Sequence, residues 1–219
     1  MRTRVKQPLK FKNVFLRGAL ALLLAIACVP AEAIASGSQA WGSTWGYAAI
    51  YQKVGDDGYA LVLQSSPSAD TSYGRLVQCE PATDSGLLVG DIEMQHAITE
   101  VIVRDTLRPS GLPHAFAYLD QCTSMDLSKL DTSSVTDMSN MFERCSSLTS
   151  LDLGSFDTSS VTDMGCMFGG CQSLTSLDLG SFDTSSVTDM RSMFSRCSLL
   201  ETIYATGKYT TALEESCGD

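Results

Sequence analysis

The sequence predicts an α/β solenoid, a stack of short coils preceded by a small β-rich region. The first observation is a 26-residue unit that begins with "DTSSVTDM" at Asp131 and returns at Asp157 and Asp183. The second is a change of hydrophobic period within each unit, from helical spacing to alternation. Because so short a unit cannot bury an apolar face alone, neighbouring units must share one core.

The chain begins with the features of a secretory signal peptide, over residues 1–33. Six basic residues precede the apolar run "GALALLLAIACVPA", which is too short for a comfortable membrane span. Small-residue triplets predict cleavage before Ile34 or Ser36. A less favoured alternative is lipidation at Cys28, although Ala25 stands where a large aliphatic residue is expected. We therefore expect a secreted or cell-surface protein with no membrane insertion after cleavage.

The exported chain is strongly acidic. Without residues 1–33, nine Lys and Arg oppose 24 Asp and Glu, a net charge of −15. Such a field repels phosphate backbones and anionic lipid, so nucleic acid is not an expected partner.

The segment before the repeats is predicted to have two parts. Residues 34–46 form a small, polar, Gly-rich and Ser-rich linker. In residues 47–104 the segments "YAAIYQKV", "YALVLQSS", "GRLVQCEP" and "ITEVIVRD" predict short strands between Gly, Pro and Asp turns. We expect this β-rich region to cap the first coil, because an open end of a repeat array exposes apolar residues.

Four units of 26 residues follow, of which the first is degenerate, and residues 209–219 form a C-terminal tail. The units are 105–130, 131–156, 157–182 and 183–208, and the second and third match at 21 of 26 positions.

Each unit predicts a short helix, a turn and a strand. In the second unit, helical spacing relates Val135, Met138, Met141, Phe142 and Cys145, and Thr136 or Asp137 would cap this helix. The strand is predicted by the inward positions Leu148, Leu151, Leu153 and Phe156.

The cysteines do not predict a disulfide framework. Cys145, Cys171 and Cys197 recur at the repeat period, which is typical of small buried side chains, and we expect free thiols there. Pairing among the remaining exported cysteines stays open. These are Cys79, Cys122, Cys166 and Cys217.

No catalytic residue, cofactor site or metal site is predicted, and we expect no enzyme. The two histidines, His96 and His114, lie in no nucleophile elbow, zinc-ligand spacing or phosphate-binding loop. Serines recur as turn residues without a base at a defined position.

Aspartates form three ladders at the repeat period. The ladders are Asp126, Asp152 and Asp178; Asp131, Asp157 and Asp183; and Asp137, Asp163 and Asp189. Calcium binding would relieve the repulsion between stacked carboxylates. Hydrogen bonding to backbone amides at turns is the favoured interpretation for the second and third ladders, and the first is expected to be simply exposed.

The side of the strands that faces away from the core is the candidate partner-binding face. Its residues are Thr149, Ser150, Asp152, Thr175, Ser176, Asp178, Thr202 and Tyr204. Rows of Ser, Thr and Asp lack the aromatic and arginine anchors that concentrate binding energy, with Tyr204 as the exception.

The unit "DTSSVTDMSNMFERCSSLTSLDLGSF" resembles the 26-residue repeat of BspA-like bacterial surface proteins, a leucine-rich-repeat group. The resemblance covers 105–208, roughly half of the chain. It implies leucine-rich-repeat-like coils whose strand face docks partners, and a surface or secreted protein for adhesion. The partner would be a protein on a host or neighbouring-cell surface. The alternative is a spacer or stalk without its own ligand, with activity in the N-terminal region or in a further C-terminal part.

The last unit departs from the repeat. There "LLETIYATGKYTT" replaces the strand and the turn of the next unit, so few residues cover the core of the final coil. We expect self-association through this coil, and whether the natural C-terminus is complete stays open.

Overall fold

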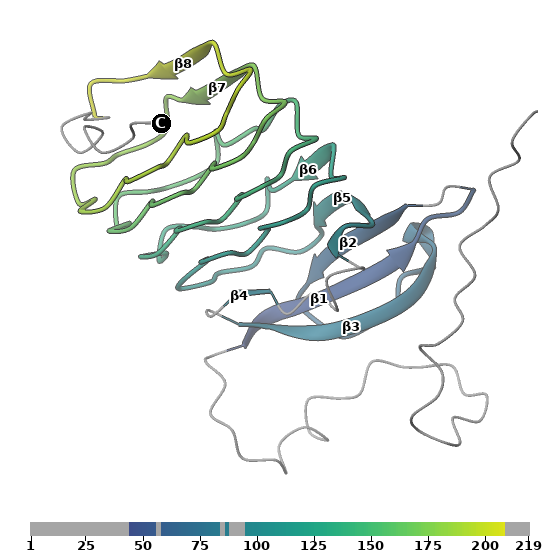
Figure 1. Cartoon of the computed structure of the whole chain (residues 1–219). Helices are drawn as coiled ribbons and strands as arrows, with labels where there is room; N and C mark the ends of the chain where they lie inside the picture. The colour runs from purple at the N-terminus through teal and green to yellow at the C-terminus, as the bar shows by residue number, and fades with distance from the viewer. Residues whose placement is uncertain (1–43, 56–57, 84–85, 88–94, 209–219) are drawn as a thin grey trace, which may run out of the picture.

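The computed structural model describes residues 44–55, 58–83, 86–87 and 95–208. The predicted signal peptide, Cys28, most of the predicted linker, Cys217 and the tail lie outside these residues. The elements in order are β1 (Thr44–Gln52), β2 (Tyr59–Gln64), η1 (Thr71–Tyr73), β3 (Arg75–Thr83), β4 (Gly86–Leu87), β5 (Ile98–Val103), β6 (Ser124–Asp126), β7 (Ser176–Leu179) and β8 (Thr202–Ala205) (Figure 1). Strand β1 begins at Thr44, so the last three residues of the predicted linker are already in a strand.

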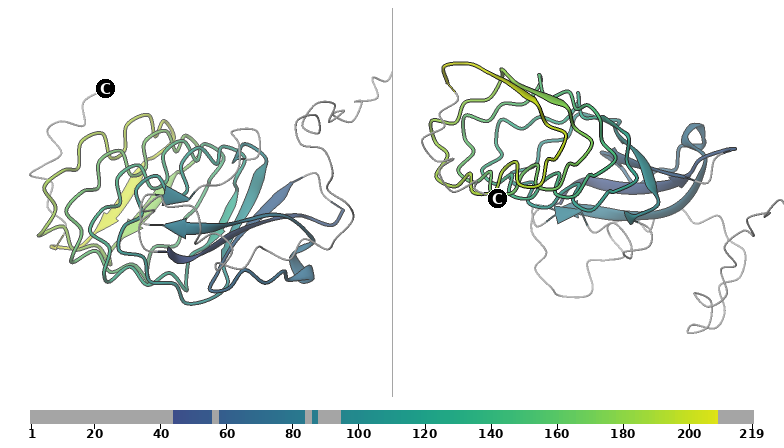
Figure 2. Two further views of the ribbon diagram at one scale, coloured as in Figure 1. Left: turned by 90° about the horizontal axis from the view of Figure 1, so that it is seen from below. Right: turned by 45° about the horizontal axis from the view of Figure 1, so that its top comes forward.

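A six-stranded mixed sheet lies at one end of a stack of coils (Figure 2). The strand order is β4-β3-β1-β2-β5-β6. Strand β1 pairs antiparallel with β2 and β3, whereas β2 pairs in parallel with β5, and β5 with β6. Because β6 belongs to the first repeat, the sheet of the N-terminal region continues directly into the first coil.

Apolar side chains cover both faces of this sheet, because successive residues of a strand point to opposite faces. On one face, Ile50, Leu61 and Leu63 belong to the same buried cluster as the core of the coils. On the other face, Tyr51 and Val62 form a smaller cluster, against which Tyr73 and neighbouring side chains pack. The first cluster joins the N-terminal region and the repeats into one core.

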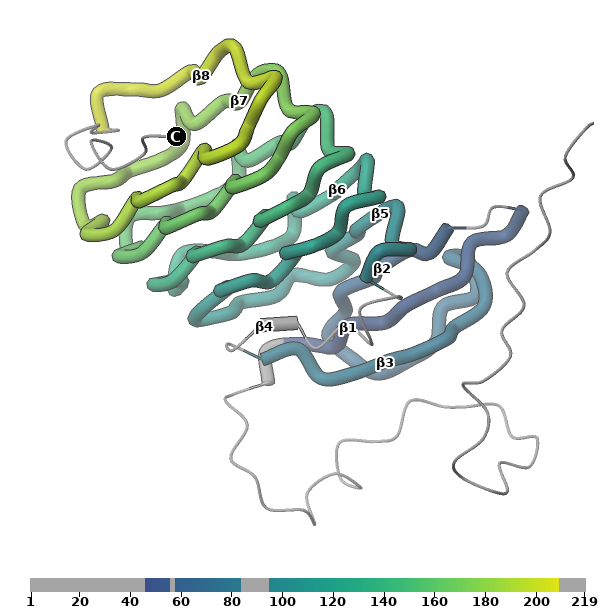
Figure 3. The backbone as a smooth tube through the Cα atoms, viewed as in Figure 1, coloured from purple at the N-terminus to yellow at the C-terminus, as the bar shows by residue number. Residues whose placement is uncertain are grey.

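Successive coils lie side by side (Figure 3). Backbone hydrogen bonds connect each coil to the next. The Met138 amide donates to the Asp163 carbonyl at 2.9 Å, and the Thr162 amide to the Thr136 carbonyl at 2.8 Å. One phenylalanine from each coil stacks on the next with ring centroids 5.6–5.7 Å apart. These are Phe116, Phe142, Phe168 and Phe194.

The predicted α/β solenoid is wrong. No helix occurs within residues 105–208, where the coils consist of turns and extended segments with only β6, β7 and β8 as strands. The strands of the coils do not close into one continuous sheet, because β6 pairs with β5, β7 pairs with β8, and the second unit contributes no strand between them.

The backbone explains why the helix does not form. Each coil has two residues with positive φ, between 53° and 78°, and such residues interrupt a right-handed helix. These are His114, Tyr118, Asn140, Arg144, Cys166, Gly170, Ser192 and Arg196. In addition, alternate amides of the predicted helix donate to the next coil instead of to a carbonyl one turn back.

The apolar stripe that suggested a helix is nevertheless buried. Val135, Met138, Met141, Phe142 and Cys145 all have exposures of 0%. A coil of consecutive turns therefore places side chains at these spacings in the core as completely as a short helix would.

A threonine at the start of the second and of the third repeat connects neighbouring coils. The buried Thr132 hydroxyl donates to the Asp157 carbonyl at 2.9 Å and accepts from the Asp157 amide at 2.8 Å. Thr158 makes the same two bonds with Asp183. The Thr of "DTSS" thus connects each of these two repeats to the next one.

Candidate functional site

The predicted partner-binding face is exposed at all eight of its positions. Strands β7 and β8 form its regular part, where Ser176 lies opposite Thr202 and Asp178 opposite Tyr204. The Tyr204 side chain is 60% exposed. The pairing brings these four residues together, and Thr149, Ser150 and Asp152 occupy the equivalent exposed positions of the second unit, outside any strand.

The core side of β7 has the predicted register. Leu177 and Leu179 are at most 1% exposed, as is Leu153 in the second unit, while Ser176 and Asp178 alternate with the two leucines of β7 and face solvent. Leu151 is only partly buried, although it packs against the core. The alternation thus orients the polar rows outward on a base of buried leucines.

All nine ladder aspartates accept a hydrogen bond from the backbone amide two residues later. Examples are Asp152 with the Gly154 amide at 2.9 Å and Asp163 with the Gly165 amide at 2.8 Å. The remaining pairs are Asp126 with Ser128, Asp131 with Ser133, Asp137 with Ser139, Asp157 with Ser159, Asp178 with Gly180, Asp183 with Ser185 and Asp189 with Arg191. The favoured interpretation holds for the second and third ladders. It extends to the first ladder, which was expected to be simply exposed.

In the second ladder these turn bonds stabilise the charged carboxylates. Hydrogen bonds from Ser159 hold the pKa of Asp157 below its ordinary value, although the neighbouring Asp131 and Asp183 oppose this shift. Cations flank the ladder, with Arg108 Nε 2.9 Å from Asp131 and Lys208 Nζ 3.4 Å from Asp183. In the described part of the chain, no three His, Cys, Asp or Glu side chains form a group that could hold a metal ion.

The repeat cysteines face inward as free thiols. The Cys145 thiol donates to the Phe116 carbonyl at 3.1 Å, and the Cys171 thiol to the Phe142 carbonyl at 3.2 Å. Burial raises the pKa of Cys171 to about 12 and that of Cys145 well above its ordinary value. Cys197, in the last coil, is half-buried with a raised pKa for the same reason. The prediction of buried free thiols is confirmed for Cys145 and Cys171.

No disulfide joins Cys79, Cys122 and Cys166 to one another, and Cys122 and Cys166 are free thiols. Burial raises the pKa of Cys122 to about 11.

A depression of about 340 Å³ lies on the edge of the coils, and it was not predicted from the sequence. Its lining includes Tyr118, Arg144, Gly170 and Arg196, which occupy the same slot in the four units, and His96 with Asp120. The histidine Nδ1 lies 3.0 Å from the Asp120 carboxylate. This slot holds a different side chain in nearly every unit, so the repeat pattern of the sequence does not reveal it.

Comparisons with known proteins place the repeats in the same region as the structure does. Residues 111–212 match the family described as "Mycoplasma protein of unknown function, DUF285". This match covers slightly less than half of the chain. No curated protein and no solved structure is significantly similar to the chain.

Proposed function

We propose that this protein is an exported bacterial surface or secreted protein that binds another protein through the exposed strand face. The observation that carries the proposal is a row of outward side chains on one two-stranded ladder: Ser176 and Asp178 in β7, which alternate with buried leucines, and Thr202 and Tyr204 opposite them in β8. The resemblance of the repeat unit to BspA-like surface proteins supports the same role. An unidentified protein of a host or neighbouring cell is the proposed partner.

The face has one aromatic anchor. Tyr204 is 60% exposed, whereas Ile203, the next residue back in β8, pairs with the buried Leu177 and points to the opposite side of the two-stranded ladder. Tyrosine is enriched among residues that dominate binding energy, so we expect Tyr204 to contribute most.

The experiment uses the whole mature chain, because the N-terminal sheet and the coils share one core. Labelled protein is added to epithelial cells and to bacterial cells, with and without prior protease treatment of the cells. We expect saturable, protease-sensitive binding that Tyr204→Lys or Ser176→Lys weakens. Ser134→Lys introduces the same charge at an exposed position outside the face and should leave binding unchanged.

A spacer role is the second candidate, and the polar character of the face favours it. Apart from Tyr204, the face consists of Ser, Thr and Asp, which rarely anchor a partner. A spacer predicts no saturable binding by the wild-type chain on any cell, and such a result would refute the interaction proposal.

Export is a separate prediction, since residues 1–33 lie outside the described structure. The order of basic, apolar and small residues predicts a mature N-terminus at Ile34 or Ser36. N-terminal sequencing of the native protein checks it. A chain that begins with a lipid-modified Cys28 would replace the soluble form with an anchored one, and an intact Met1 would refute export. Within the described residues, no helix has the length and apolarity to span a membrane.

A further inference from the structure

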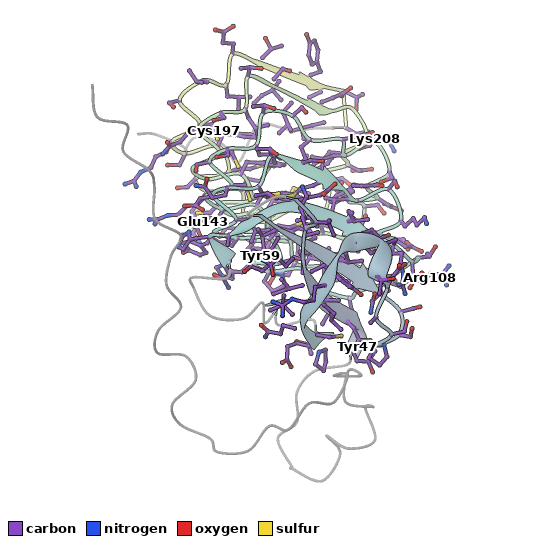
Figure 4. The ribbon with its side chains drawn as sticks, turned by 90° about the vertical axis from the view of Figure 1, so that its right-hand side faces the viewer. Tyr47, Tyr59, Arg108, Glu143, Cys197 and Lys208 are labelled. Atoms are coloured by element: carbon purple, nitrogen blue, oxygen red, sulfur yellow. The ribbon has the colours of Figure 1, made fainter. Side chains whose placement is uncertain are left out.

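We propose that the depression on the edge of the coils is a second binding site, which takes a sugar that carries a carboxylate. The depression is formed by residues that precede the strand residues within each coil. It is separate from the partner-binding face. Figure 4 labels Glu143, next to the Arg144 slot, on one side of the stack, and Arg108 and Lys208 on the other. The proposal rests on the charges, the side-chain chemistry and the shape of this depression.

Two arginines make this depression the place for an anion on an acidic protein. Arg144 and Arg196 are exposed and occupy the same slot two coils apart. Arg144 approaches Glu143 only to 3.9 Å, and within residues 95–208 the structure records no ion pair for Arg196. An arginine fork matches a carboxylate in two parallel hydrogen bonds, so each of these guanidinium groups is suited to a carboxylate held in the depression.

Gly170 leaves room between the two arginines. It occupies the same slot in the intervening coil, and a Cβ atom added there would lie 3.3 Å from Cγ of Arg144. A side chain at this position would therefore compete with Arg144 for the space between the coils. The glycine converts a row of side chains into a notch that arginines flank.

The rest of the lining suits a sugar ring. Ser146 and Gln172 offer a hydroxyl and an amide. The Arg144 guanidinium covers one face of the Tyr118 ring, with Cζ 5.5 Å from the ring centroid, and so holds this ring at the edge of the depression. The volume of about 340 Å³ is at the small end of ligand sites. A polar lining with one aromatic ring fits hydroxyl-rich ligands better than the apolar side chains of a peptide.

The net charge argues for a ligand with a single negative charge. The Asp120 carboxylate lies in the same lining, paired with His96, and the exported chain has a net charge of −15. The negative field of the protein would repel every charged group of a sulfated or phosphorylated polymer. A single carboxylate, in contrast, can bind beside the two arginines.

The test measures binding of glucuronate to the mature chain by isothermal titration calorimetry, with glucose, acetate, inorganic phosphate and a glutamate-rich peptide as comparison probes. We expect saturable glucuronate binding and none with glucose. In Arg196→Gly the affinity should fall about ten- to a hundredfold, and in the double variant with Arg144→Gly it should be lost. Glycine suits the positive φ of both positions, so the melting temperature should stay unchanged or rise.

Arg191→Gly is the matched control. It removes the same charge at a slot where the preceding unit has Gly165, and it lies outside the depression. This variant and Tyr204→Lys should bind glucuronate like the wild type. The proposal is overturned if the double variant binds normally or if glucuronate does not bind. It is equally overturned if acetate, phosphate or the peptide binds as tightly as glucuronate.

Discussion

At the scale of single residues, several residues of the repeated segment have separate physical roles in the structure. In "DTSSVTDM" the first Asp accepts the amide of the Ser two residues later, and the Thr between them clamps the next coil. Val135 and Met138 enter the core with exposures of 0%. These roles explain the near identity of the units at these positions. Each of these side chains either fills the core or pairs with a backbone group that would otherwise lack a partner.

The register of β7 leads to a paired substitution. Leu177→Asp places a charge without a partner at a position that is 1% exposed and should destabilise the fold by about 4 kcal/mol or more. Ser176→Asp introduces the same charge on the exposed side and should cost no more than about 0.5 kcal/mol. Urea unfolding of both variants checks this, and equal midpoints would refute the register.

The buried thiols predict slow chemistry in the native state. With pKa values raised by burial, to about 12 for Cys171 and well above the ordinary value for Cys145, neither forms thiolate at pH 8. We expect alkylating reagents to modify these two cysteines only after denaturation. Mass spectrometry of labelled peptides measures it, and a cross-linked pair of ladder cysteines would contradict the expectation.

At the scale of elements, the coil resembles neither a helix nor a regular strand. Positive φ at two positions per unit turns the chain repeatedly, and the amides released from local bonding pair with the adjacent coil. A coil of this kind depends on its neighbours, because a large share of its backbone hydrogen bonds crosses to the next unit. Stability should therefore respond strongly to the turns at the edges of the coils.

The turn aspartates make the coils sensitive to acid. Hydrogen bonds from the following Ser or Arg residues lower the pKa values of Asp126, Asp131, Asp157, Asp183 and Asp189 below their ordinary value of 3.8. The unfolded chain then binds protons more readily than the folded chain. The stabilisation is present above about pH 4 and is lost as the pH falls through the lowered pKa values.

Thermal unfolding between pH 7 and pH 2 measures this loss. Asp157→Asn keeps an oxygen that accepts the Ser159 bonds but removes a titrating group, so its melting temperature should fall less at low pH. Glu201→Gln removes one charge from an exposed residue outside the ladders and serves as the control. A wild-type melting temperature that is constant across this range would contradict the role of the turns.

At the scale of the whole molecule, the N-terminal sheet and the coils form one body. Parallel pairing of β5 with β6 extends the sheet into the first repeat, and one buried cluster runs from Ala48 to Met193. The β-rich region therefore covers the first coil, as a cap is expected to do. Separating the two parts would expose the inner sides of both.

The opposite end of the stack presents an exposed strand. All four residues of β8 are exposed, Leu199 is 56% exposed, and within residues 95–208 no strand pairs with the outer edge of β8. Because unpaired edges associate with one another, we expect concentration-dependent self-association of the mature chain. Analytical ultracentrifugation should show it reduced by Ile203→Lys and unchanged by Ser134→Lys. A strictly monomeric wild type at high concentration would refute this.

The sequence by itself determined the repeat period, the buried and exposed positions of most of each unit, the turn role of the aspartates and the free state of Cys145 and Cys171. These follow from side-chain burial and from bonds between residues close in the chain, which leave periodic patterns. Only the tertiary structure decided the backbone of the coils, the Thr132 clamp, the joining of β5 to β6 and the depression that Arg144 and Arg196 line. The physical reason is that their partners lie about one or two repeats away. A stripe such as Val135, Met138, Met141 and Phe142 is buried equally in a helix and in a row of turns, and only hydrogen bonds to the next coil select between them.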